Sequence, residues 1–146
     1  MPLLTREQLA SFGKPVEPGD LSLKDKTFEF LVQLMGYRAQ LRLNHWQTTS
    51  YAEHKMTDKL LEVLEENIDT IGEIALGLFE RPQINSMSIS VQDMRIASTK
   101  YILDEINKSL CSLVEEYKVT SHEGMITALG DLCAEMNKFK YLSTLE

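Results

Sequence analysis

Residues 50–80 read SYAEHKMTDKLLEVLEENIDTIGEIALGLFE and predict one long amphipathic helix. The segment opens with Ser50 followed three residues later by Glu53, the pattern of a capping box, and Pro82 cannot continue it. One side of this helix is apolar: Met56, Leu60, Leu64, Ile68, Ile71, Ala75 and Leu78. A helix with one continuous apolar side must bury it against other helices, so the segment predicts a helical bundle.

The other side of this predicted helix carries carboxylates and a histidine. His54 precedes Asp58 by four residues, and Asp69 precedes Glu73 by four. At about 100° per residue these positions fall within an arc of roughly 100°, so they share one face. Asp58 and Asp69 are nevertheless roughly 16 Å apart along the axis, at about 1.5 Å per residue. One metal centre within one chain cannot use both, whereas two chains packed antiparallel could bring the two pairs together.

A second helix is predicted on the N-terminal side of residue 50. It starts after Ser22, which has Asp25 three residues further on as in a capping box, and it ends at residues 48–50, three poor helix formers. Its apolar stripe consists of Phe28, Leu31, Val32, Met35, Ala39, Leu43 and Trp46.

Two further helices are predicted after Pro82. Residues 82–90 are expected to form a polar loop or short crossover between the second and third helices. Capping patterns place the start of the third helix at Ser90 and the start of the fourth at Thr120. Both helices continue with apolar residues at heptad spacing: Leu103, Ile106, Leu110, Leu113 and Tyr117, then Met125, Leu129, Leu132, Met136 and Phe139. The chain is therefore predicted to be all-α, a four-helix bundle.

Length and charge limit the classes of protein. The chain has 146 residues, the length of one domain, and we expect an N-terminal tail at 1–20 and the bundle at 21–146. The net charge is -7 and the pI is near 5.0, which suits a protein that attracts cations. DNA binding is not expected, because phosphate binding needs clustered lysine and arginine.

The two cysteines, Cys111 and Cys133, lie beside helical apolar positions and belong to no C-x-x-C pair. We expect buried free thiols in a reducing cytosol, with a disulfide as the open alternative. No apolar run is long enough to span a membrane, and Arg6 and Glu7 interrupt any signal peptide. A cytoplasmic location is therefore predicted.

Another histidine, His45, lies upstream of the helix at 50–80 and is followed directly by Trp46. Imidazole and carboxylate ligands suit iron, zinc or manganese. No Glu-x-x-His occurs, so a di-iron site inside a single chain's core is not expected. Taken alone, an acidic helix face is more often only solvated. A non-enzymatic assembly that holds structural zinc, or no metal, on the same face is the alternative reading.

Residues 44–73 resemble the ferroxidase motif of the Dps family, the mini-ferritins named for DNA protection during starvation. That motif has His-Trp at the end of the first helix, then His-x-x-x-Asp, then Asp-x-x-x-Glu eleven residues beyond the first Asp. The matching residues here are His45-Trp46, His54 and Asp58, and Asp69 and Glu73. The connection between the two histidines is shorter than is usual in the family, and the N-terminus lacks the Lys-rich tail of DNA-binding members.

The resemblance implies a ferritin-like bundle that acts as a ferroxidase and iron-storage protein. Its catalytic, metal-binding residues would be His45, His54 and Asp58 of one chain with Asp69 and Glu73 of another. Iron would be oxidised there by peroxide or dioxygen, and zinc could take its place. The resemblance also implies a homo-oligomer, a dodecamer with the dimer as its smallest functional unit. The string from His45 to Lys55 is also similar to a ferritin-like group of phages and large DNA viruses.

Overall fold

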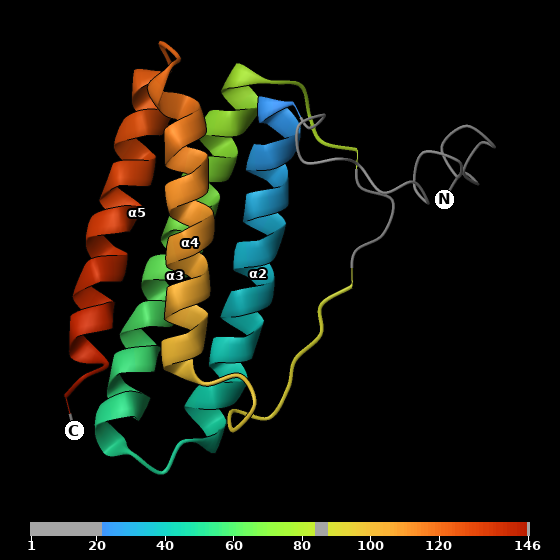
Figure 1. Cartoon of the computed structure of the whole chain (residues 1–146). Coiled ribbons are helices and arrows are strands. Elements are labelled where there is room, and N and C mark those ends of the chain that lie inside the picture. Colours follow the sequence, from blue (N-terminus) through green and yellow to red (C-terminus); the bar gives the residue numbers. More distant parts are fainter. Residues whose placement is uncertain (1–21, 84–87, 146) are drawn as a thin grey trace, which may run out of the picture.

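Four long helices make up the part of the chain that the computed structural model describes, residues 22–83 and 88–145 (Figure 1). They are α2 (Leu23–Gln47), α3 (Tyr51–Leu78), α4 (Thr99–Lys118) and α5 (Glu123–Leu142). The predicted all-α four-helix bundle is confirmed. The tail predicted at 1–20 lies outside the described residues.

The connections fix the direction of each helix in the bundle. Short turns join α2 to α3 and α4 to α5, so each of these pairs is antiparallel (Figure 1). The connection 79–98 leads from one end of the bundle to the other, and α4 therefore runs parallel to α3. Around the bundle, α2 packs against α3 and α4, and α5 packs against the same two helices. The crossover is longer than the short one that the sequence predicted.

Two of the predicted helix starts are confirmed by their capping hydrogen bonds. The hydroxyl of Ser22 accepts a hydrogen bond from the backbone N–H of Asp25 at 3.1 Å, at the start of α2. The hydroxyl of Ser50 accepts one from the backbone N–H of Glu53 at 3.2 Å, at the start of α3. In both cases the cap is made within four consecutive residues, which is why the sequence pattern was sufficient.

The predicted start of the third helix at Ser90 was wrong. The hydroxyl of Ser98 caps α4 instead, accepting from the backbone N–H of Tyr101 at 3.2 Å. Asp93, which had suggested a capping box, accepts hydrogen bonds from the side chain and backbone N–H of Arg95, both at 2.9 Å. These bonds lower the pKa of the Asp93 carboxyl to about 2. The carboxylate thus closes a turn before the helix.

The predicted cap of the fourth helix at Thr120 was also wrong. The hydroxyl of Thr120 donates to the backbone carbonyl of Tyr117 at 2.7 Å and so closes the end of α4. The residue at the N-cap position of α5 is His122, whose side chain makes no capping hydrogen bond. Helix α5 nevertheless begins at Glu123, the residue that the pattern placed in its first turn.

Amide side chains of α2 hold the end of the crossover against the bundle. The side chain of Gln40 donates to the backbone carbonyl of Gln92 at 2.6 Å and accepts from its N–H at 2.8 Å. Asn44, one turn further along α2, donates to the backbone carbonyl of Ala97 at 2.9 Å. Both amides are buried, and these bonds satisfy backbone groups of a segment that has no helix of its own.

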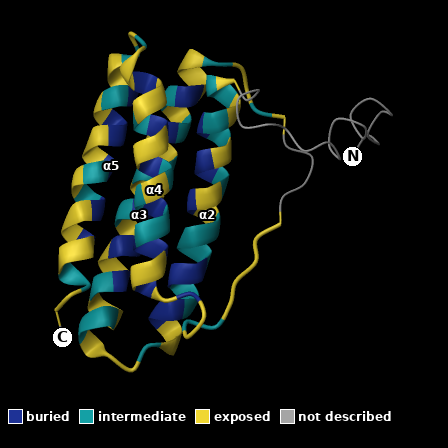
Figure 2. Ribbon diagram, in the orientation of Figure 1, coloured by how far each residue is buried: buried dark blue, intermediate teal, exposed yellow. Residues whose placement is uncertain are grey.

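Leucines dominate the bundle's buried centre, and exposed residues cover its outer surface (Figure 2). Two predictions about burial were wrong. Trp46, placed on the apolar stripe of the first helix, is 71% exposed. Cys111 is exposed and Cys133 is half-buried, although both were expected to be buried. None of the described helices is long and apolar enough to cross a membrane.

Candidate functional site

The two predicted histidine ligands lie in direct contact. His45 is in the last turn of α2 and His54 is in the first turn of α3, on either side of the turn at 48–50. Their rings stack with centroids 3.9 Å apart and an angle of 20° between the ring planes. The short connection therefore brings the two imidazoles together.

Hydrogen bonds determine which ring nitrogen of each histidine is free. The hydroxyl of Thr57 donates to the backbone carbonyl of Glu53 at 2.8 Å, so it accepts from Nδ1 of His45, which lies 2.9 Å away. Nδ1 of His54 lies 3.2 Å from the backbone carbonyl oxygen of His45, which can only accept. Both Nδ1 atoms therefore carry the hydrogen in the neutral rings, and both Nε2 atoms keep a lone pair for a metal ion.

A network of polar side chains lies next to the histidines in the sequence and joins three helices. The carboxylate of Glu53 accepts from the hydroxyl of Thr48 at 3.1 Å and from the hydroxyl of Thr99 at 2.9 Å. It thereby joins the end of α2 and the start of α4 to the first turn of α3. Asn44 donates to the hydroxyl of Thr99 at 3.3 Å. This network and Thr57 were missed from the sequence, where the one available signal was a threonine on the apolar side of a helix.

One edge of the histidine pair is open to solvent. His45 is only 8% exposed, whereas His54 and the carboxylate residue one turn further on, Asp58, are both exposed. Two large aromatic side chains lie exposed on the neighbouring turns, Trp46 at 71% and Tyr51 at 75%. The His54 side chain and the Asp58 carboxylate are therefore on a surface that an ion or another chain can reach, while the His45 ring lies beneath it.

The second carboxylate pair lies further along α3. Asp69 and Glu73 are exposed and line a shallow surface hollow together with Phe28 and Arg81. At about 1.5 Å per residue the distance from Asp58 to Asp69 along the helix remains roughly 16 Å, so the structure does not bring the two pairs together in one chain. Within the described ranges, no group of three or more His, Cys, Asp or Glu side chains of the single chain could hold a metal ion.

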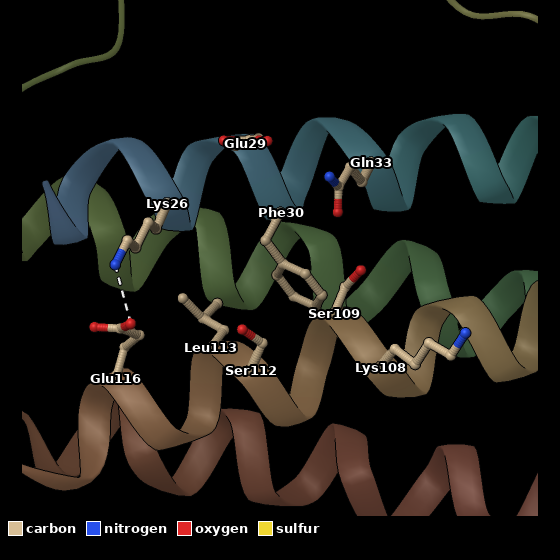
Figure 3. Close-up of a pocket in the computed structure, with 9 residues that line it drawn as sticks. All are labelled: Lys26, Glu29, Phe30, Gln33, Lys108, Ser109, Ser112, Leu113 and Glu116. Atoms are coloured by element: carbon tan, nitrogen blue, oxygen red, sulfur yellow. Dashed lines mark hydrogen bonds and ion pairs between the residues drawn. The ribbon is translucent and has the colours of Figure 1, made fainter. Parts of the chain in front are cut away.

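A larger groove lies between α2 and α4 and contains none of the predicted ligands (Figure 3). Phe30 and Leu113 contribute its apolar part, and an ion pair crosses it from the ammonium of Lys26 to the carboxylate of Glu116 at 2.9 Å. Its charged groups are of both signs and partly neutralise one another.

The fold and the site define a class, a four-helix bundle with a stacked pair of imidazoles, one buried and one exposed, and with exposed carboxylates on α3. Residues 45–142 match the model of the DUF5856 family, a family of unknown function, and the chain belongs to it. The match begins at His45 and so includes every predicted ligand, while most of α2 precedes it. No curated protein and no solved structure matches the chain.

Proposed function

We propose that the chain is a Dps-like ferroxidase and iron-storage protein whose metal site is completed by two chains. In this proposal Fe(II) is the substrate. It binds to His45, His54 and Asp58 of one chain together with Asp69 and Glu73 of another.

The observation that carries the proposal is the stacked pair of histidines. Two imidazoles whose Nδ1 atoms are occupied by hydrogen bonds to a hydroxyl and a carbonyl have the arrangement of metal-ligating histidines, in which an outer partner fixes the tautomer and orientation. The buried His45 ring stacks at 3.9 Å on the exposed ring of His54, an arrangement that a histidine serving only the core does not require.

The proposed sharing of the site rests on the length of α3. We call each pair on α3, His54 with Asp58 and Asp69 with Glu73, a dyad. Each dyad alone supplies too few ligands for an iron centre. The described part of one chain offers no group of three or more such side chains that could hold a metal ion. If two α3 helices pack antiparallel, His54 and Asp58 of one chain face Asp69 and Glu73 of the other. The single long crossover also supports the proposal, because ferritin-like bundles have one such connection.

The chemistry follows from the ligand set. Two Fe(II) ions give one electron each to a peroxide molecule, whose O–O bond breaks, and two protons complete two water molecules. The carboxylates favour the Fe(III) product over Fe(II), because the more highly charged ion gains more from nearby negative charge. The net charge of -7 also raises the local concentration of the cation around the protein.

Stopped-flow absorbance of ferric species after mixing with Fe(II) and peroxide tests the proposal. The variant Asp58→Ala, Glu73→Ala should oxidise Fe(II) no faster than buffer. Its matched control is Glu62→Ala, Glu66→Ala, which removes two exposed carboxylates of the same helix outside the dyads and should keep the wild-type rate. Equal rates for the wild type and the dyad variant would remove the enzymatic function.

The exposed aromatic side chains favour one second candidate. Trp46 and Tyr51 beside the histidine pair are typical of residues that anchor a protein interface. The same face would then serve assembly, with zinc as a structural ion. In that case Fe(II) oxidation stays at the rate of buffer, while Zn²⁺ raises the melting temperature of the assembly.

A further inference from the structure

Two thiols lie opposite each other on α4 and α5, the helices that carry none of the proposed ligands. The carboxylate of Asp104 on α4 and the ammonium of Lys140 on α5 are 3.4 Å apart and fix the register of these helices. Cys111 lies seven residues after Asp104, and Cys133 lies seven residues before Lys140. Because the helices are antiparallel, both steps lead about two turns in the same direction. The two cysteines are therefore neighbours across the α4–α5 contact.

The two thiols differ in how solvent reaches them. Cys111 is exposed and lines a surface hollow together with Lys108 and Lys140, each of which is ion-paired with a carboxylate of α4. Cys133 is half-buried against the core. Burial raises the pKa of the Cys133 thiol, and the nearby charge of Cys111 raises it further. Cys111 is thus the thiol that a small oxidant meets first.

We propose that Cys111 and Cys133 are a redox-active pair that hydrogen peroxide converts into a disulfide between α4 and α5 of the same chain. A disulfide needs Cα atoms within roughly 7 Å. Helix axes in bundles lie roughly 8–10 Å apart and each Cα lies about 2.3 Å from its axis, so residues at the edge of the contact between two neighbouring helices can meet this requirement. The proposal is independent of the ferroxidase function.

The reaction has two steps. The Cys111 thiolate attacks one oxygen of peroxide, the O–O bond breaks, and a sulfenic acid and hydroxide form, the latter taking up the thiol proton as water. The Cys133 sulfur then attacks the Cys111 sulfur, the S–O bond breaks, and a second water leaves. Two thiols are oxidised by two electrons in total, one peroxide is reduced, and an external dithiol reverses the change.

The test treats the full-length chain with hydrogen peroxide in the presence of a chelator, so that bound iron plays no part. The expected product has lost both of its two free thiols and two hydrogens in intact mass. A proteolytic digest should contain a peptide pair linked through Cys111 and Cys133, and dithiothreitol should restore both thiols. A disulfide between two chains, or thiols that outlast free glutathione in the same solution, would overturn the proposal.

Single serine variants separate the roles of the two thiols. Cys133→Ser should accumulate a sulfenic acid at Cys111 that dimedone traps, because the second thiol is missing. Cys111→Ser should lose its remaining thiol several-fold more slowly, because Cys133 is half-buried. Equal rates of thiol loss in the two variants would contradict the assignment of Cys111 as the first thiol to react.

Discussion

Nδ1 of His54 lies 3.2 Å from the backbone carbonyl oxygen of His45, and the two rings stack 3.9 Å apart. One histidine therefore orients the other through its backbone, while its own ring is held by Thr57. The hydrogen bond that orients His54 does not use the side chain of His45, so it remains when the His45 imidazole is replaced.

Thr57→Val tests whether the threonine hydroxyl orients a ligand. Valine has nearly the same shape but leaves the buried Nδ1–H of His45 without an acceptor, so the free energy of unfolding should fall by about 1–3 kcal/mol. Affinity for Co²⁺, a redox-stable probe of the site, should fall about 10–100-fold. Urea unfolding and calorimetric titration measure the two effects.

The control is Thr57→Ser, which keeps the hydroxyl and should keep both the stability and the Co²⁺ affinity. Unchanged Co²⁺ affinity in Thr57→Val would show that His45 is not a ligand.

The buried phenol of Tyr117 should make the free energy of unfolding depend on pH in the alkaline range. It is fully buried, and burial raises the pKa of its phenol. In the unfolded chain tyrosine ionises near pH 10, while the folded chain keeps the proton at that pH. The stabilisation that comes from keeping this phenol protonated in the fold is therefore complete below about pH 10. It is lost as the pH rises through the folded-state pKa.

The variant Tyr117→Phe should lack this part of the alkaline loss. Because Thr27 donates to the carbonyl of Leu23 at 2.7 Å, it is the acceptor for the Tyr117 hydroxyl, and the substitution should cost about 1 kcal/mol at neutral pH. Urea midpoints of both proteins between pH 7 and pH 11 provide the measurement. If the difference between the two proteins stays constant across this range, Tyr117 has no part in the pH dependence.

The proposed shared site requires a stable oligomer. Light scattering should give a mass of at least two chains of 16.7 kDa, and the resemblance to Dps proteins implies a dodecamer. The measurement should be made at micromolar concentration with and without Fe(II). A monomer under both conditions would end both the shared-site proposal and the storage proposal.

The features of the fold that were predicted correctly depend on residues close together in the sequence. The caps at Ser22 and Ser50 are made by residues three positions away, and the apolar stripes repeat with the helix period. The start of α4 could not be predicted in this way. The segment before it is held by Gln40 and Asn44, which lie about fifty residues earlier in the sequence, and no local pattern records such contacts.

The candidate site likewise has features that the sequence predicts and features that it does not. The motif points to the five candidate ligands, His45, His54, Asp58, Asp69 and Glu73, because the spacing of residues along the sequence is a local property. The stacking of the rings depends on the angle between α2 and α3. The roles of Thr57 and Glu53 depend on which groups of neighbouring helices their oxygens meet, so these features needed the three-dimensional structure.

The central claim is that the ligands of one site come from two chains, and complementation between two inactive variants tests it most directly. One variant carries His54→Ala and Asp58→Ala, and the other carries Asp69→Ala and Glu73→Ala. Alone, each should be inactive, because every shared site lacks one dyad. After the two are mixed, unfolded and reassembled, each mixed pair has one site with both dyads intact, and Fe(II) oxidation should return to about a quarter of the wild-type rate if pairing is random and the sites are independent. Each variant reassembled with itself is the control. Mixed oligomers verified by mass that show no recovered activity would contradict the account.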